Sequence, residues 1–195
     1  MLITKQQLKD ISGCPYYDGS VIHERFAYKF FRDKVSPLGN IIAFRAPMEV
    51  TDNLIDLEDS LSKDYIYSDD AINFCLEIPK VDLFGGICFQ RLFNAQCAHM
   101  LATQYVNKPV IIDGDDVLFD VNGETKKSSV SIAAEKNGAV LIHTAFNIHA
   151  GTKAPDFAFS TELSDEQVEE FAKKVCEMFY SILFDVFKAS TKIII

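Results

Sequence analysis

The sequence lacks close cysteine pairs and long apolar runs, and each absence excludes a class of protein. Its five cysteines lie far apart and none forms a CxxC pair, so neither secretion nor a disulfide framework is expected. Every apolar run is shorter than the roughly 18 to 20 residues that a helix needs to cross a bilayer. We therefore predict a cytoplasmic protein that has no membrane partner.

Basic residues are also scarce, since 19 Lys and Arg stand against 28 Asp and Glu, a formal charge of −9. Binding to the phosphate backbone of nucleic acid needs the opposite excess, so the charge argues against a nucleic-acid partner. The sequence contains no Walker-type loop, no dinucleotide-binding glycine motif, no nucleophile elbow and no metalloprotease helix. No cluster of His, Cys or acidic residues has a specific metal-binding spacing, and we expect no bound metal.

Apolar and aromatic residues are plentiful. They make up 48% of the 195 residues and include 16 Phe, which is enough to bury a large core without crosslinks. No internal repeat and no run rich in Ser and Gly divides the chain. We predict a single domain that spans residues 1–195.

The spacing of the apolar residues predicts an α+β fold. Helical spacing occurs over residues 21–31, over 85–106 and over 164–186, where Ser164 and Gln167 form a capping box. Strands are expected at 41–44 and 71–78, and three more within 111–148. Residues 52–59 show no pattern long enough to assign. The order favours a mainly antiparallel sheet flanked by helices on one side.

Two Asn-Gly pairs predict tight hairpins in the segment 111–150, where we place any chemistry of this protein. A two-residue loop at Asn122-Gly123 sets Leu118 opposite Lys127 and Asp116 opposite Ser129. Asp116, Lys127, Ser129 and Ser131 then share one polar face. Such a face is typical of the solvated side of a sheet, but its small hydroxyl side chains leave room for a ligand.

The third strand of the segment carries His143 and Asn147 on one face. A two-residue loop at Asn137-Gly138 would place His143 on the side of Ile132, in the core, whereas a bulge would place it beside Lys127. We favour the core position.

Arg45 is expected at the end of the strand 41–44, before Pro47. Its planar guanidinium could clamp a carboxylate or a phosphate. The alternative is a surface ion pair with Glu58 or Asp59.

Short motifs along nearly the whole chain resemble an uncharacterised prokaryotic family of domains of unknown function. They are Arg45-Ala46-Pro47, Asp56-Leu57-Glu58-Asp59, Gln90-Arg91-Leu92, Gly114-Asp115-Asp116, Ser129-Val130-Ser131-Ile132 and Asn147-Ile148 with Gly151-Thr152. The resemblance implies the fold shared by biotin and lipoate protein ligases and by class II aminoacyl-tRNA synthetases.

The same resemblance implies roles for individual residues. The ligases' turn before their catalytic lysine would fall on Asp115 and Asp116, the lysine on Lys127, and their closing asparagine on Asn147. A lysine beside an acyl-adenylate stabilises the charge that develops on carboxyl and phosphate oxygens. ATP is accordingly a candidate cofactor.

Two hypotheses follow. In the first, the protein binds a small carboxylate- or phosphate-bearing ligand, with Arg45 and Lys127 as its cationic contacts, and acts in the stronger form as an acyl or adenylyl transferase. The remaining residues expected to line this site are Asp115, Asp116, Ser129, Ser131 and Asn147. In the second, the apolar end Ile193-Ile194-Ile195 marks a non-catalytic homo-oligomeric binding module.

Overall fold

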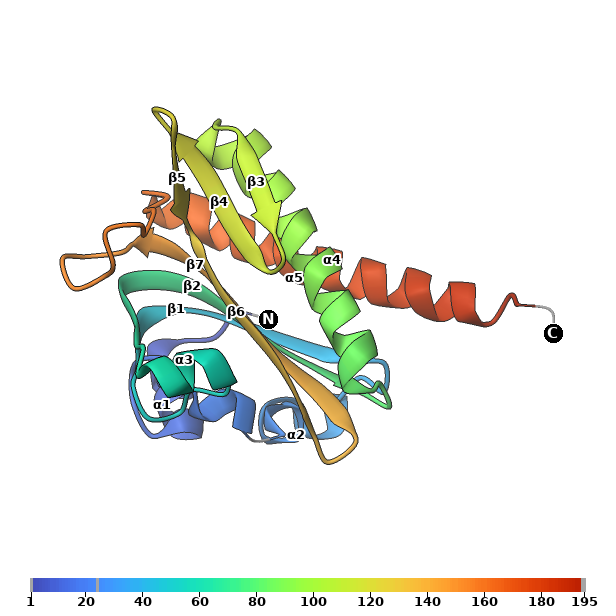
Figure 1. Cartoon of the computed structure of the whole chain (residues 1–195). Helices are drawn as coiled ribbons and strands as arrows, with labels where there is room; N and C mark the ends of the chain where they lie inside the picture. The colour runs from blue at the N-terminus through green and yellow to red at the C-terminus, as the bar shows by residue number, and fades with distance from the viewer. Residues whose placement is uncertain (1, 24, 194–195) are drawn as a thin grey trace.

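The computed structural model describes residues 2–23 and 25–193 and is built around a four-stranded antiparallel sheet (Figure 1). The strand order is β1-β2-β7-β6, with β1 Asn40–Val50, β2 Ile66–Pro79, β7 Ala139–His149 and β6 Ser129–Lys136. A second antiparallel sheet holds β3 (Val110–Asp113), β4 (Asp116–Val121) and β5 (Glu124–Lys127) in that order. The predicted α+β class, a mainly antiparallel sheet flanked by helices, is confirmed.

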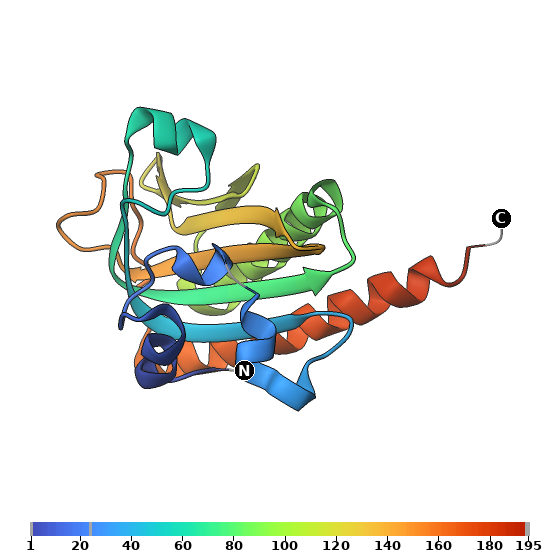
Figure 2. The same cartoon turned by 90° about the horizontal axis from the view of Figure 1, so that it is seen from below.

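Helices cover both faces of the four-stranded sheet (Figure 2). One face packs against α4 (Leu83–Leu101) and α5 (Asp165–Ser190), and the other against α1 (Lys5–Ser12), the 3₁₀ turn η1 (Ser20–His23) and α2 (Phe26–Phe31). Alternate side chains of each strand enter the two cores, as Phe74 and Cys75 do in β2. The expectation of helices on one side is wrong, because the predicted helical segment 21–31, together with α1, covers the second face.

The long helices follow local signals. The Ser164 hydroxyl accepts a hydrogen bond from the Gln167 amide at 3.3 Å, and the Gln167 side chain accepts one from the Ser164 amide at 2.9 Å, which confirms the capping box. Helix α4 is capped by Asp82, whose carboxylate accepts from the Gly85 amide at 2.7 Å. It continues into one π-helical turn, Ala102–Val106, so the predicted end of this helix is correct.

Other elements differ from the expectation. The segment 21–31, which was expected to form one helix, contains the turn η1 and the separate helix α2. Strands β1 and β2 extend well beyond the apolar runs that predicted them, and the segment left unassigned contains a short helix, α3 (Leu57–Ser62).

Both hairpins form at the Asn-Gly pairs, and the first has the predicted register, with Val121 opposite Glu124 and Leu118 opposite Lys127. However, five strands in two sheets replace the expected three. The chain leaves the smaller sheet after Lys127, and Ser129 pairs with Phe146 in the larger one. The predicted pairing of Asp116 with Ser129 is therefore wrong.

Within residues 2–23 and 25–193, no helix combines the length and the apolar composition that crossing a membrane requires.

Candidate functional site

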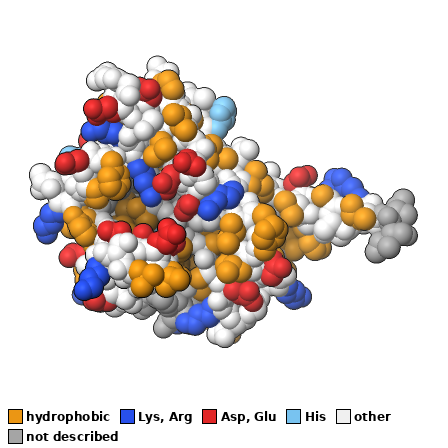
Figure 3. Space-filling model, viewed as in Figure 1, with side chains coloured by type: hydrophobic (Ala, Val, Ile, Leu, Met, Phe, Trp, Pro, Cys, Tyr) orange, Lys and Arg blue, Asp and Glu red, His pale blue; other side chains and the backbone are white. Residues whose placement is uncertain are grey.

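A cavity of about 500 Å³ lies on the face of the larger sheet that also carries η1. Strands β6 and β7 form its floor, the ends of β4 and β5 form one wall, and α3 with its flanking residues forms the opposite edge. Figure 3 shows acidic side chains gathered beside this hollow. Its volume falls in the range of small-molecule sites, about 300 to 1,000 Å³.

Lys127 ends β5 and is the single Lys or Arg among the described residues that line the cavity. Its ammonium lies 2.6 Å from the Asp116 carboxylate, and about a third of each side chain is exposed. Its backbone is held by hydrogen bonds of 2.8 Å to Phe157 and Phe159. Because an ammonium has three donors, the pair with Asp116 leaves Lys127 able to contact a ligand.

Ser129 and Ser131 line the cavity, but their hydroxyls bond within the protein. The Ser129 hydroxyl accepts from the Val117 amide at 2.8 Å. The Ser131 hydroxyl accepts from the Gln90 side chain at 2.7 Å and lies 2.8 Å from the Thr144 hydroxyl. These contacts join the two sheets and α4, so neither hydroxyl is aimed at a ligand.

Asn147 lies in the floor of the cavity, on β7, and is 5% exposed. Its backbone is fixed by Ser128, which accepts from the Asn147 amide at 2.9 Å, and by Thr161, whose hydroxyl donates to the Asn147 carbonyl at 2.8 Å. The buried side-chain Oδ1 has no hydrogen-bond partner among the described residues. A buried acceptor without a partner costs about 1 to 3 kcal/mol, which a donor in the cavity would offset.

His143 is buried, as predicted, and also forms part of the cavity floor. Its ring stacks on Tyr17 at 3.7 Å between centroids, and Nε2 lies 3.0 Å from Asn73 Oδ1. The Asn73 amide nitrogen donates to Ala46 and Ala71, so Oδ1 is the acceptor and His143 Nε2 carries the hydrogen. Burial lowers the pKa of His143 to about 3, which keeps the ring neutral.

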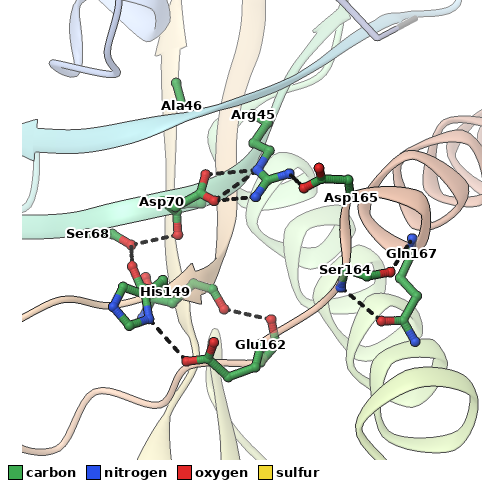
Figure 4. A network of polar contacts seen from close by, with 12 residues as sticks. Arg45, Ala46, Ser68, Asp70, His149, Glu162, Ser164, Asp165 and Gln167 are labelled. Carbon is green, nitrogen blue, oxygen red and sulfur yellow. Dashed lines mark hydrogen bonds and ion pairs between the residues drawn. The ribbon is translucent and has the colours of Figure 1, made fainter.

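Arg45 points to the face of the larger sheet opposite the cavity, and Figure 4 shows its guanidinium between the carboxylates of Asp70 and Asp165. Its side chain shares a face of β1 with Ile41 and Ala43, which pack toward α4 and α5. Its guanidinium bonds Asp70 at 2.6 Å and Asp165 at 2.5 Å, not Glu58 or Asp59. The structure therefore does not bring Arg45 to the cavity, because the alternation of side chains along β1 points it away.

Acidic residues dominate the polar lining of the cavity. They are Asp56, Glu58, Asp59, Asp64, Asp115 and Asp116. The Asp56 carboxylate caps α3 through the Glu58 and Asp59 amides, and Asp115 lies 3.1 Å from Arg91. Burial, followed by the charges of Asp56 and Asp64, raises the pKa of Asp59. The sequence indicated Asp115 and Asp116, but it gave no sign that the acids of α3 would face the same cavity.

The acidic residues do not form a ready metal site. In the part of the chain that the structure describes, no three His, Cys, Asp or Glu side chains are grouped so that they could hold a metal ion.

Comparisons with known proteins bear on the fold. The chain matches the model of a domain of unknown function, DUF366, over residues 8–194. No match was found among curated proteins. A solved protein of unknown function from Pyrococcus horikoshi is 25% identical, with a TM-score of 0.78 and 92% of each chain covered.

Two ligases are more distant in sequence. A bi-partite lipoate protein ligase from Thermoplasma acidophilum is 15% identical, with a TM-score of 0.53, 90% of this chain covered and 79% of the other. A biotin protein ligase mutant from Aquifex aeolicus in complex with biotin is 12% identical, with a TM-score of 0.52, 76% of this chain covered and 62% of the other. At such identities the likeness concerns the fold alone. The chain thus belongs to the DUF366 family and has a fold similar to that of the biotin and lipoate protein ligases.

Proposed function

We propose that the protein binds a small carboxylate-bearing molecule in the cavity between α3 and strands β4 to β7, with Lys127 as the contact for the carboxylate. The observation that carries this proposal is the Lys127 side chain, the single Lys or Arg among the described residues that line this cavity of about 500 Å³. An ammonium stabilises a carboxylate through a charge-assisted hydrogen bond.

The rest of the lining suits an apolar body. Ile22, Val50 and Ile132 line the cavity from three different elements, and apolar area that a ligand buries against them contributes about 25 cal/mol per Å². The ligand would then lie with its apolar part against these residues and its polar end at Lys127.

A phosphate fits this lining less well than a carboxylate. Six carboxylates surround the single ammonium, and a phosphate or triphosphate would add further negative charge in a partly buried space, where like charges repel more strongly than in water. For this reason ATP is not part of the proposal.

The fold supports a small-acid ligand by analogy, since one structure of similar fold is a complex with biotin, which is itself a carboxylic acid. The catalytic form of the proposal is acyl transfer from an activated thioester of such an acid to a nucleophile, with the thiol as the leaving group, in which Lys127 would stabilise the negative charge that develops on the acyl oxygen.

Thermal unfolding in the presence of hexanoic acid, lipoic acid and biotin tests the binding. A ligand present at 100 times its dissociation constant adds about 2.7 kcal/mol to the free energy of unfolding. The Lys127→Ala variant should lose this gain. Lys126→Ala is the matched control, because the Lys126 ammonium bonds the Asp156 carbonyl at 3.3 Å and does not line the cavity. Equal stabilisation of Lys127→Ala and the wild type, or no effect of any acid, would contradict the proposal.

A second candidate function is a homo-oligomeric binding module. The last turns of α5 extend beyond the sheet (Figure 1), and there Phe184, Val186 and Phe187 are 60%, 48% and 50% exposed. Large exposed apolar side chains gathered at one helix end are typical of a surface that another protein chain covers. Ile193 is also exposed, whereas Ile194 and Ile195 lie outside the described residues.

Light scattering tests this second candidate. Phe187→Ser should lower the mass of the oligomer, whereas Tyr28→Ser, on the distant and exposed surface of α2, should leave it unchanged. A wild-type protein with the mass of a monomer would remove the candidate.

A further inference from the structure

We propose that the molecule bound beside Lys127 also carries a protonated amine, so that the ligand class is aliphatic acids with an amino group. This inference rests on the proposed function, because it concerns the same cavity. The amine would bind to the carboxylates of α3 and to Oδ1 of Asn147, which has no hydrogen-bond partner among the described residues.

The first support is the imbalance of charge. Six carboxylates and one ammonium line the cavity, and that ammonium is already 2.6 Å from Asp116. If Arg91, which pairs with Asp115, is counted together with Lys127, the carboxylates still outnumber the cations by four. A ligand with only a carboxylate would increase this excess, whereas an amino acid adds no net charge and an amine reduces the excess.

The second support is independent of the acids. Asn147 is buried in the cavity floor, and its Oδ1 accepts no hydrogen bond from the described residues. The atom can only accept, so it needs a donor. A carboxylate offers no donor, but an ammonium offers three.

The third support is the state of Asp59, which lies on α3 across the cavity from Lys127. Burial, Asp56 and Asp64 raise its pKa, while the charge of Lys127 lowers it. Part of this rise comes from repulsion between the Asp59 carboxylate and those of Asp56 and Asp64, which flank α3. A cation bound between them would relieve this repulsion and would hold α3 against the sheet.

Isothermal titration calorimetry at low salt tests the inference with three probes of equal chain length: hexanoic acid, 2-aminohexanoic acid and hexylamine. We expect 2-aminohexanoic acid to bind at least about tenfold more tightly than hexanoic acid, which corresponds to about 1.4 kcal/mol. The preference should shrink as salt is added, because the carboxylates of α3 are partly exposed.

Asp59→Asn should reduce the preference for the amino acid without weakening the binding of hexanoic acid. Asp52→Asn is the matched control, since Asp52 is exposed and does not line the cavity. Hexanoic acid binding as tightly as 2-aminohexanoic acid, or a preference unchanged in Asp59→Asn, would overturn the inference and leave the proposed function standing. Binding of none of the three probes would overturn both.

Discussion

His143 should make the stability of this protein depend on pH between about 3 and 6.5. Its pKa is about 3 in the folded protein, lowered by burial from an ordinary value of 6.5. Between these values the unfolded chain binds the proton and the folded protein does not. The free energy of unfolding therefore rises with pH across this range, and its contribution is lost as the pH falls below 6.5.

The size of the effect follows from the two pKa values. At pH 5 the unfolded histidine is almost fully protonated, and this lowers the free energy of unfolding by about 2 kcal/mol relative to pH 7. The loss would grow to about 4 kcal/mol if the protein stayed folded to pH 3. For a domain whose total stability is typically about 5 to 15 kcal/mol, the change at pH 5 is large enough to measure accurately.

Urea unfolding of the wild type and of His143→Gln at pH 7 and pH 5 provides the measurement. The variant should be less stable at pH 7, because it loses the stack on Tyr17, but it should lack the loss of about 2 kcal/mol between the two pH values. His143→Phe, which keeps an aromatic ring beside Tyr17, should likewise show no such loss of stability between pH 7 and pH 5.

The exposed His149 serves as a control of opposite sign. The hydrogen bond that its ring donates to the Glu162 carboxylate raises the pKa of His149, so any stability it contributes is present at low pH and is lost as the pH rises. His149→Gln should leave the loss between pH 7 and pH 5 in place. If His143→Gln lost as much stability at pH 5 as the wild type does, the assignment of His143 as a buried neutral group would be refuted.

Two further predictions concern the side of the sheet opposite the cavity. Arg45→Ala should lower the free energy of unfolding by at most about 1 kcal/mol, because its pairs with Asp70 and Asp165 are partly exposed, and calorimetry should find ligand binding unchanged. Gly86→Ala should cost about 1 to 3 kcal/mol in urea unfolding, since its added Cβ would lie 2.7 Å from Val140 Cγ2. Val140→Ala should recover part of that loss in the double variant, and purely additive losses would contradict the close contact.

Local signals in the sequence predicted the elements that depend on local contacts. The Asn-Gly pairs gave both hairpins, since Asn122 and Gly123 both adopt the positive φ that a tight turn requires. The capping box of Ser164 and Gln167 correctly predicted where α5 begins. The same kind of box, Thr4 with Gln7, caps α1, and that helix could have been predicted from it.

The contacts that build the cavity depend on distant parts of the chain. The pattern of β5 continues without a break through Ser128 into β6, so nothing local marks the change of sheet, and only the pairing of Ser129 with Phe146 fixes it. In the same way, Asp59 looks like a solvated surface acid until α3 is placed over β6 and β7. Arg45 was assigned to the site because its sequence neighbours could not show which face of β1 it occupies.

The change of sheet at Ser128 has a mechanical consequence. Lys127 belongs to the smaller sheet and Asn147 to the larger one, and the Ser128 backbone is bonded to both, through Val117 and Asn147. A molecule held by Lys127 and Asn147 together would contact both sheets beside this covalent and hydrogen-bonded link. Binding would then add a further tie between the two sheets, beside the backbone bonds of Ser128 that already join them.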